Sequence, residues 1–263
     1  MNKALLTLII ITFRLGSTFA QTEAEKFRNE NLSSTYISSV ELKEKFIRYD
    51  YSKLFTVTDN AMVYGFIGDN FQRIRIKIIS ITKNPSLPDT YNVYGKSMVK
   101  NNIDEFRGTI KITNIRKYKQ TSYGVDNELK GKGIKGQYLL IGNYNLAEAA
   151  TQEHAGVFKG TFGTGFYPDK NNIVHYDDID KNADGYSNNQ FVGQWVSHNN
   201  KLVKRCNWGD YRIPNSQGFD IGAGEFSPND KYLSAGWQTL RDAYRTSAVS
   251  AKAKQIENAK WWE

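Results

Sequence analysis

Residues 105–112 read EFRGTIKI, and the core of this stretch belongs to a pattern that recurs along the chain. The pattern is a large apolar residue, glycine two positions later, and a second large residue two positions after that. It occurs at four places: FRGTI at 106–110, IKGQY at 134–138, FKGTF at 158–162 and FVGQW at 191–195. Residues two apart share one face of a β-strand. The glycine and both large side chains of each repeat are therefore predicted to point the same way.

Glycine weakens a strand unless a bend or a close approach of another group requires the space. Four such strands predict a tightly curved sheet whose inner face alternates small and large residues, as the inside of a small closed barrel does. The residues between them are expected to face mostly water. The predicted fold is mainly β, an antiparallel up-and-down barrel of about eight strands with a C-terminal α-helix. A β-sandwich is the alternative, because alternation alone does not distinguish the two.

From residue 64 to about residue 204 the apolar residues recur with a period of two, which indicates strands and not helices. Within 71–78, isoleucines alternate with cations, so Arg73 and Arg75 are expected to face solvent. Short segments rich in Pro, Asn and Asp separate the runs and predict antiparallel hairpins. The predicted strands are 49–58, 71–78, 91–99, 106–118, 134–143, 156–166, 191–197 and 201–208.

The GQW sequence at 193–195, the glycine–aromatic repeats and the serial hairpins resemble the calycin-type up-and-down barrels, the lipocalin- and avidin-like proteins. Those families carry short Gly-x-Trp or Gly-x-aromatic elements in their strands, and the likeness covers about residues 64–204. In lipocalins the Gly-x-Trp element comes near the start of the barrel, whereas here it comes late. The resemblance implies a barrel that can hold an interior cavity, and it carries over no site residue.

Four segments make up the predicted domain organisation. Residues 1–20 are predicted to be a signal peptide, and the polar segment 21–40 is expected to be mobile or only locally ordered. Residues 41–228 form the barrel domain, which ends in an irregular segment rich in aromatic residues and glycine at 207–228. An apolar stripe at a spacing of three to four residues predicts a helix within 229–263 that packs on the barrel.

The signal peptide predicts an exported protein, periplasmic or extracellular. Its features are a cation at Lys3, an apolar run too short to span a membrane, and small residues up to Ala20. No other stretch is apolar enough for a transmembrane segment. Cys206 is the only cysteine, and a buried, inert thiol is expected.

The charge of the chain narrows the choice of partners. The net charge is +8, but the cations are interleaved with acids, and no nucleic-acid-binding motif is present. Nucleic acid is therefore not a predicted partner. An unknown small molecule, a glycan or a protein remains.

Residues 178–185 read DIDKNADG, which places oxygen ligands at alternate positions before a turn glycine, as a calcium loop does. Phe191 stands where an EF-hand has its bidentate Glu, so an EF-hand is excluded. A polar turn is the simpler interpretation. Ca²⁺ is the only cofactor predicted, and the alternative is no cofactor. The candidate ligands are Asp178, Asp180, Asn182 and Asp184.

Two kinds of functional site fit the aromatic-rich segment after the barrel strands. Binding of a ligand at the barrel mouth or on an aromatic surface is the leading prediction, with the candidate residues Trp195, Trp208, Tyr211 and Trp237. The alternative is a secreted carbohydrate-active hydrolase, since glycosidases need two carboxylates across a cleft. Its candidate catalytic residues are Asp210, Asp220 and Glu225. A third prediction is a protein-binding scaffold or inhibitor whose barrel is filled by side chains. Whether the protein is an enzyme stays open, and binding is favoured.

Overall fold

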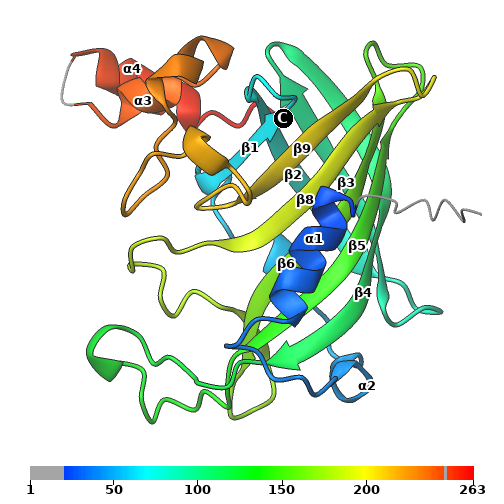
Figure 1. The fold of residues 1–263 in the computed structure, drawn as a ribbon, viewed down its shortest axis with the longest axis vertical. Helices are drawn as coiled ribbons and strands as arrows, with labels where there is room; N and C mark the ends of the chain where they lie inside the picture. Colours follow the sequence, from blue (N-terminus) through cyan, green and yellow to red (C-terminus); the bar gives the residue numbers. More distant parts are fainter. Residues whose placement is uncertain (1–20, 246–247) are drawn as a thin grey trace, which may run out of the picture.

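The computed structural model describes residues 21–245 and 248–263, and the predicted signal peptide lies outside them. Within this part of the chain, nine strands form one antiparallel sheet in the order β5-β4-β3-β2-β1-β9-β8-β6-β7. Because β5 also pairs with β6, eight strands close into a barrel (Figure 1), and β7 pairs with the last residues of β6 at the edge of the sheet. The strands are β1 (Val63–Ile67), β2 (Gln72–Lys83), β3 (Thr90–Val99), β4 (Asn102–Lys117), β5 (Tyr138–Glu148), β6 (Gly156–Pro168), β7 (Val174–Tyr176), β8 (Asn188–Ser197) and β9 (Val203–Asp210).

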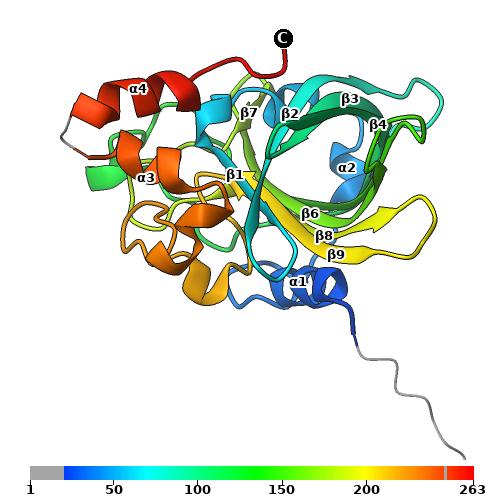
Figure 2. The same cartoon turned by 90° about the horizontal axis from the view of Figure 1, so that it is seen from above.

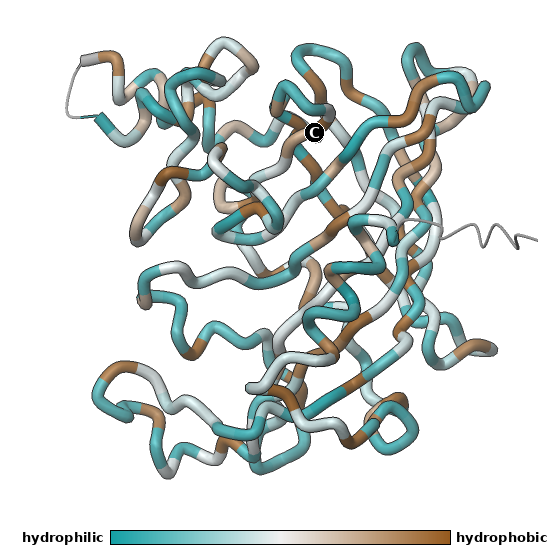
Figure 3. The backbone as a smooth tube through the Cα atoms, viewed as in Figure 1, coloured by the Kyte–Doolittle hydropathy of each residue, from teal (hydrophilic) through white to brown (hydrophobic). Residues whose placement is uncertain are grey.

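The closed antiparallel barrel confirms the predicted fold class and replaces the sandwich alternative. Figure 3 shows brown apolar and teal polar residues alternating along several of the barrel strands. The helices are α1 (Glu23–Leu32), α2 (Lys43–Phe46), α3 (Gln238–Ala243) and α4 (Ala248–Glu257). Short 3₁₀ helices are η1 (Ser52–Phe55), η2 (Asn60–Met62), η3 (Val125–Asn127), η4 (Gln217–Phe219) and η5 (Asp230–Ala235).

Glycines on the inner face make room for aromatic rings of the neighbouring strand. Gly95 lies opposite Phe106, and a Cβ at Gly95 would come within 2.5 Å of that ring. Gly142 has the same relation to Phe162, again at 2.5 Å. The small–large alternation of the interior is therefore a cross-strand arrangement, in which each ring covers a glycine.

One of the four repeats that were predicted to lie in strands does not lie in one. IKGQY at 134–138 precedes β5, and Gly136 has a φ of +132°, which is not a strand conformation. The repeat that β5 uses is LIGNY at 140–144, with Gly142 at its centre. The strand prediction at 134–143 is accordingly shifted, since β5 begins at Tyr138.

The two ends of the barrel differ. At one end the strands are joined by the short connections 68–71, 100–101, 149–155 and 198–202. At the other end the connections are long, and the segment before β1 enters the barrel. There Phe55 packs edge-on against Phe162 at 5.5 Å, and Asn189 donates to the Leu54 carbonyl at 2.8 Å. The strand predicted at 49–58 is therefore wrong, because this segment forms η1 and plugs the closed end.

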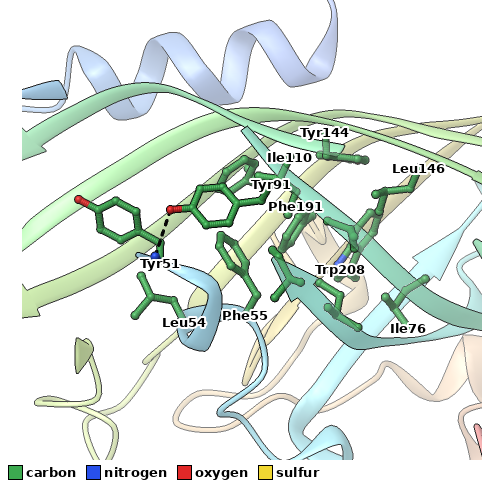
Figure 4. Close-up of a cluster of buried hydrophobic side chains, with 14 of the residues drawn as sticks. Tyr51, Leu54, Phe55, Ile76, Tyr91, Ile110, Tyr144, Leu146, Phe191 and Trp208 are labelled. Atoms are coloured by element: carbon green, nitrogen blue, oxygen red, sulfur yellow. Dashed lines mark hydrogen bonds between the residues drawn. The ribbon is translucent and has the colours of Figure 1, made fainter. Parts of the chain in front are cut away.

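Aromatic side chains fill the barrel above this plug. Phe191 stacks on Trp208 with ring centroids 4.7 Å apart, and Tyr144 meets both rings edge-on. The Tyr51 amide N–H donates a hydrogen bond to the Tyr91 hydroxyl oxygen at 3.1 Å (Figure 4). The interior near the closed end is thus a packed core.

A second apolar cluster lies on the outside of β1 and β2. Tyr64 and Phe66 point outward from β1 and are covered by Phe219, Phe226 and the fully buried Trp237. The segment predicted to be irregular, 207–228, is strand β9 up to Asp210, and from residue 211 on it packs against the outside of the barrel, followed by η5, α3 and α4 (Figure 2). The predicted C-terminal helix is present as α4, and the apolar stripe that predicted it lies mainly in η5 and α3.

The cations on the outer face of β2 are not solvated as expected. Arg73 and Arg75 both pair with Glu257 of α4, at 2.6 and 2.7 Å, and all three side chains are largely buried. Trp262 lies under Lys77, whose ammonium is 4.8 Å from the ring centroid. The alternation correctly predicted the outward direction of these cations, but it contained no information about α4, which covers them.

Helix α1 occupies the polar N-terminal segment. A capping box between Thr22 and Glu25 starts it, and Phe27 packs over Gly163 of β6. Glu23 forms a two-pronged pair with Arg205 of β9 at 2.7 and 2.8 Å. This segment is therefore ordered and attached to the outside of the barrel, whereas a mobile or only locally ordered segment was expected.

Candidate functional site at the barrel mouth

The end with the short hairpins stays open. A hollow begins inside the barrel there and continues over the rim onto the outer surface beside α1, with a volume of about 2150 Å³. Enclosed ligand pockets hold about 300–1,000 Å³, so this hollow is an open depression whose inner part is the barrel mouth. The apolar residues that line the mouth are Ile67, Ile74, Val99 and Phe158.

Polar groups from five consecutive barrel strands form a belt inside this mouth: Ser97 of β3, Asp104 of β4, Glu148 of β5, Gly156 of β6 and Trp195 of β8. Glu148 is the centre of the belt, with 4% of its surface exposed. Its Oε1 accepts a hydrogen bond from Ser97 Oγ at 2.6 Å. Its Oε2 accepts from Trp195 Nε1 and from the Gly156 amide, both at 2.9 Å.

Burial raises the pKa of both carboxyl groups in the belt. For Glu148 the three hydrogen bonds oppose this rise, and the nearby charge of Asp104 adds to it. For Asp104, which is 6% exposed, the bond from Asn102 and the charge of His154 oppose the rise. The mouth therefore holds two desolvated carboxyl groups close to each other, at a rim that also carries His154 and His198.

The four aromatic residues predicted to bind a ligand are not brought together. Trp195 lies in the mouth, whereas Trp208 belongs to the packed interior. Tyr211 follows β9 toward the closed end and packs edge-on against Tyr186 at 5.0 Å. Trp237 is fully buried outside the barrel and donates to the Phe71 carbonyl at 2.7 Å. Of these residues, Trp195 alone lines the mouth.

The carboxylates of the hydrolase alternative each have a separate structural environment. Asp210 is buried inside the closed end, where Tyr176 and Asn189 donate to its Oδ2 at 2.8 and 2.7 Å. Asp220 pairs with Arg212 at 2.7 Å, as the structural interpretation of this acid requires. Glu225 is exposed on the loop before Phe226.

Cys206 is fully buried inside the barrel, and burial raises the pKa of its thiol. The prediction of a buried thiol is thereby confirmed. Nucleophilic chemistry at this residue is disfavoured, because the thiolate is the reactive form.

The predicted calcium loop is a turn between β7 and β8. Gly185 has a φ of +77°, as the turn position requires, and Asp180 accepts a hydrogen bond from Ser122 Oγ at 2.8 Å. Among residues 21–245 and 248–263, no three His, Cys, Asp or Glu side chains are grouped as metal ligands. Calcium binding therefore stays a prediction that rests on the sequence pattern of the loop.

If the loop binds Ca²⁺, millimolar Ca²⁺ is expected to raise the Tm of the protein, with about 2.7 kcal/mol of added stability at a hundredfold excess over Kd. Asp180→Ala and Asp184→Ala should abolish the rise, and the exposed acid Glu44 supplies a control as Glu44→Ala. Differential scanning fluorimetry measures the shift. An unchanged Tm in the parent protein would show that the loop is an ordinary polar turn.

The belt residues Ser97, Asp104 and Glu148 were not predicted. The sequence signal for such a residue is a polar side chain at an inward position of a strand. Recognising it requires the correct bounds and register of that strand. Counting by two from Leu140 through Gly142 places Glu148 on the inner face, but the predicted strand ended at residue 143.

Fold and site together define a closed eight-stranded antiparallel barrel with a packed closed end and an open mouth that holds two buried carboxyl groups. The sequence matches no protein-family model, and neither a curated protein nor a solved structure is significantly similar to it. In the described ranges, no helix has the length and apolar character needed to cross a membrane.

Proposed function

We propose that this chain is an exported, calycin-like binding protein that takes a small molecule into the open end of its barrel. The observation that carries the proposal is the polar belt around Glu148 inside a mouth whose walls include Ile67, Ile74, Val99 and Phe158. Ligand sites typically combine apolar walls with a few fixed polar groups. The signal-peptide pattern in residues 1–20 supports export.

The packed interior limits how deep a ligand enters. Phe158 lines the mouth and meets Trp208 edge-on at 6.1 Å, so these rings form the floor of the site. The filled closed end favours the scaffold alternative for that part of the barrel. The mouth favours ligand binding, because a scaffold filled throughout has no need of a buried polar belt that opens to solvent.

Native mass spectrometry tests the proposal. The protein is purified from an exporting host, incubated with a small-molecule extract of that host, and compared with its denatured mass. Val99→Trp fills the mouth, and Asn92→Trp places the same ring on the outer face of the same strand. We expect an added mass on the parent and on Asn92→Trp that is absent from Val99→Trp. A bare parent chain, or an added mass that Val99→Trp retains, would contradict binding in the mouth.

A further inference from the structure

We infer that the ligand of the mouth is an organic cation, an ammonium group attached to a compact apolar body. This inference rests on the proposed function and adds the chemical class of the ligand. It follows from the hydrogen-bonding groups of the belt, from their charge, and from the walls around them.

The donors of the belt are already used. The Trp195 indole and the Gly156 amide each have one proton, and both donate to Glu148 Oε2 at 2.9 Å. The single hydroxyl proton of Ser97 is directed at Glu148 Oε1, 2.6 Å away. A ligand that needs donors, such as a carboxylate or a phosphate, finds none left among these three groups, and, of the described side chains, the buried Tyr144 hydroxyl is an unpaired donor elsewhere in the lining.

Acceptors remain free. Within the described residues, Asn102 Nδ2 donates a hydrogen bond to Asp104 Oδ2 at 2.6 Å, and no hydrogen bond reaches Asp104 Oδ1. Glu148 Oε1 accepts one bond, although a carboxylate oxygen has room for two. Ser97 and Asp104 are direct partners across β3 and β4, so these acceptors lie side by side. A ligand must therefore bring protons to this place.

The charges lead to the same class of ligand. In the described part of the chain, neither Glu148 nor Asp104 has a cationic nitrogen within the 4.0 Å of an ion pair. Buried carboxylates are ordinarily paired, and a lone one is disfavoured. The charge of Asp104 adds to the cost of ionising Glu148, and an ammonium ion between the two groups would reduce that cost.

The walls determine the rest of the ligand. Phe158 forms the floor, and Trp195 presents a ring whose indole N–H is fixed by Glu148, so the orientation of that ring is set before a ligand enters. Ile67, Ile74 and Val99 supply apolar contact. The Lys204 ammonium already lies 5.9 Å from the centroid of the Trp195 ring, so the two carboxylates, not this ring, are what a ligand ammonium would pair with.

Three matched probes test the inference by isothermal titration calorimetry: 2-phenylethylamine, 2-phenylethanol and 3-phenylpropionate. They share a phenyl group on a short chain and differ in carrying a cation, a hydroxyl or an anion. We expect the amine to bind about tenfold more tightly than the alcohol, and the carboxylate to bind more weakly than either. Val99→Trp should abolish binding of the amine, which places it in the mouth.

Asp104→Asn is the decisive variant, because it removes one charge without changing the shape of the side chain. We expect it to weaken amine binding about tenfold. Glu105→Gln removes the charge of the next residue, which lies on the outer face, and should leave binding unchanged. Thermal unfolding of both variants shows that the fold is retained.

The failures of the two proposals are distinguishable. If the alcohol or the carboxylate binds in the mouth as tightly as the amine, or if none of the probes binds at millimolar concentration, the cationic class is wrong. The same holds if the ligand found by native mass spectrometry is neutral or anionic, although the binding function would then stand. Binding function itself fails when no mass is added to the parent chain.

Discussion

Gly142→Ala is expected to destabilise the barrel by about 3 kcal/mol, although it adds only one methyl group. A Cβ at Gly142 would lie 2.3 Å from the Lys111 carbonyl oxygen and 2.5 Å from the Phe162 ring. The carbonyl belongs to the backbone of β4 and the ring to the packed interior, so neither can move away without separating strands. The substitution therefore opposes the curvature that lets β4, β5 and β6 close the barrel.

The control is Gly218→Ala in η4, where an added Cβ meets no atom within 4 Å and φ is not positive. It should leave stability unchanged or raise it by up to about 1 kcal/mol, because alanine restricts the unfolded chain. Urea unfolding of both variants, followed by tryptophan fluorescence, measures the difference. Equal stabilities would mean that the inner-face glycines are not needed for curvature.

The same contact explains how far the sequence could predict the fold. A period of two identifies strands and their inward residues, and glycine between large residues predicts strong curvature. The register between strands is a different matter, because it depends on which ring covers which glycine. IKGQY at 134–138 has the same local pattern as LIGNY at 140–144, and only the pairing of Gly142 with Phe162 selects the second.

Local sequence patterns could not predict the plug or the covering helices, for a related reason. Residues 49–58 contain enough aromatic residues for a strand, yet Phe55 finds its partners in Phe162 and Phe191, more than a hundred residues later. Arg73 is a cation in an alternating strand, and its burial depends on Glu257 at the other end of the chain. Such contacts follow from closure of the barrel, which no short window of sequence contains.

The candidate site also depends on contacts between strands that are distant in the sequence. Ser97, Asp104 and Glu148 are single polar residues near the ends of three strands, and none belongs to a motif. The pairing of β3 with β4 and of β4 with β5 brings them together. The candidates that the sequence patterns predicted, the acidic loop at 178–185 and the carboxylates from Asp210 onward, lie outside the mouth.

The second large expected effect is a dependence of the free energy of unfolding on pH, which arises from Asp210. Burial raises the pKa of its carboxyl group from an ordinary value of 3.8 to about 6, although Thr58, Tyr176 and Asn189 all donate to Oδ2 and Lys77 lies near. The folded protein therefore holds a proton here that the unfolded chain releases above pH 4. The contribution of Asp210 to stability is complete below about pH 4 and is lost as the pH rises through 6. The rise in pKa corresponds to about 3 kcal/mol.

Comparison with Asp210→Asn isolates this contribution, because burial also raises the pKa of Asp177 to about 6 and that group titrates in the same range. Asparagine keeps the shape of the side chain and does not titrate. Measured by urea unfolding from pH 4 to pH 8, the stability of the parent relative to Asp210→Asn should fall by about 3 kcal/mol. The exposed control Asp69→Asn should follow the parent at every pH. A constant difference would mean that Asp210 has an ordinary pKa, and a difference that grows with pH would mean that the hydrogen bonds to Oδ2 outweigh burial. The first result, a falling difference, would show that the cost of burying this charge outweighs the hydrogen bonds that Thr58 of the plug and Asn189 of the barrel donate to the same oxygen.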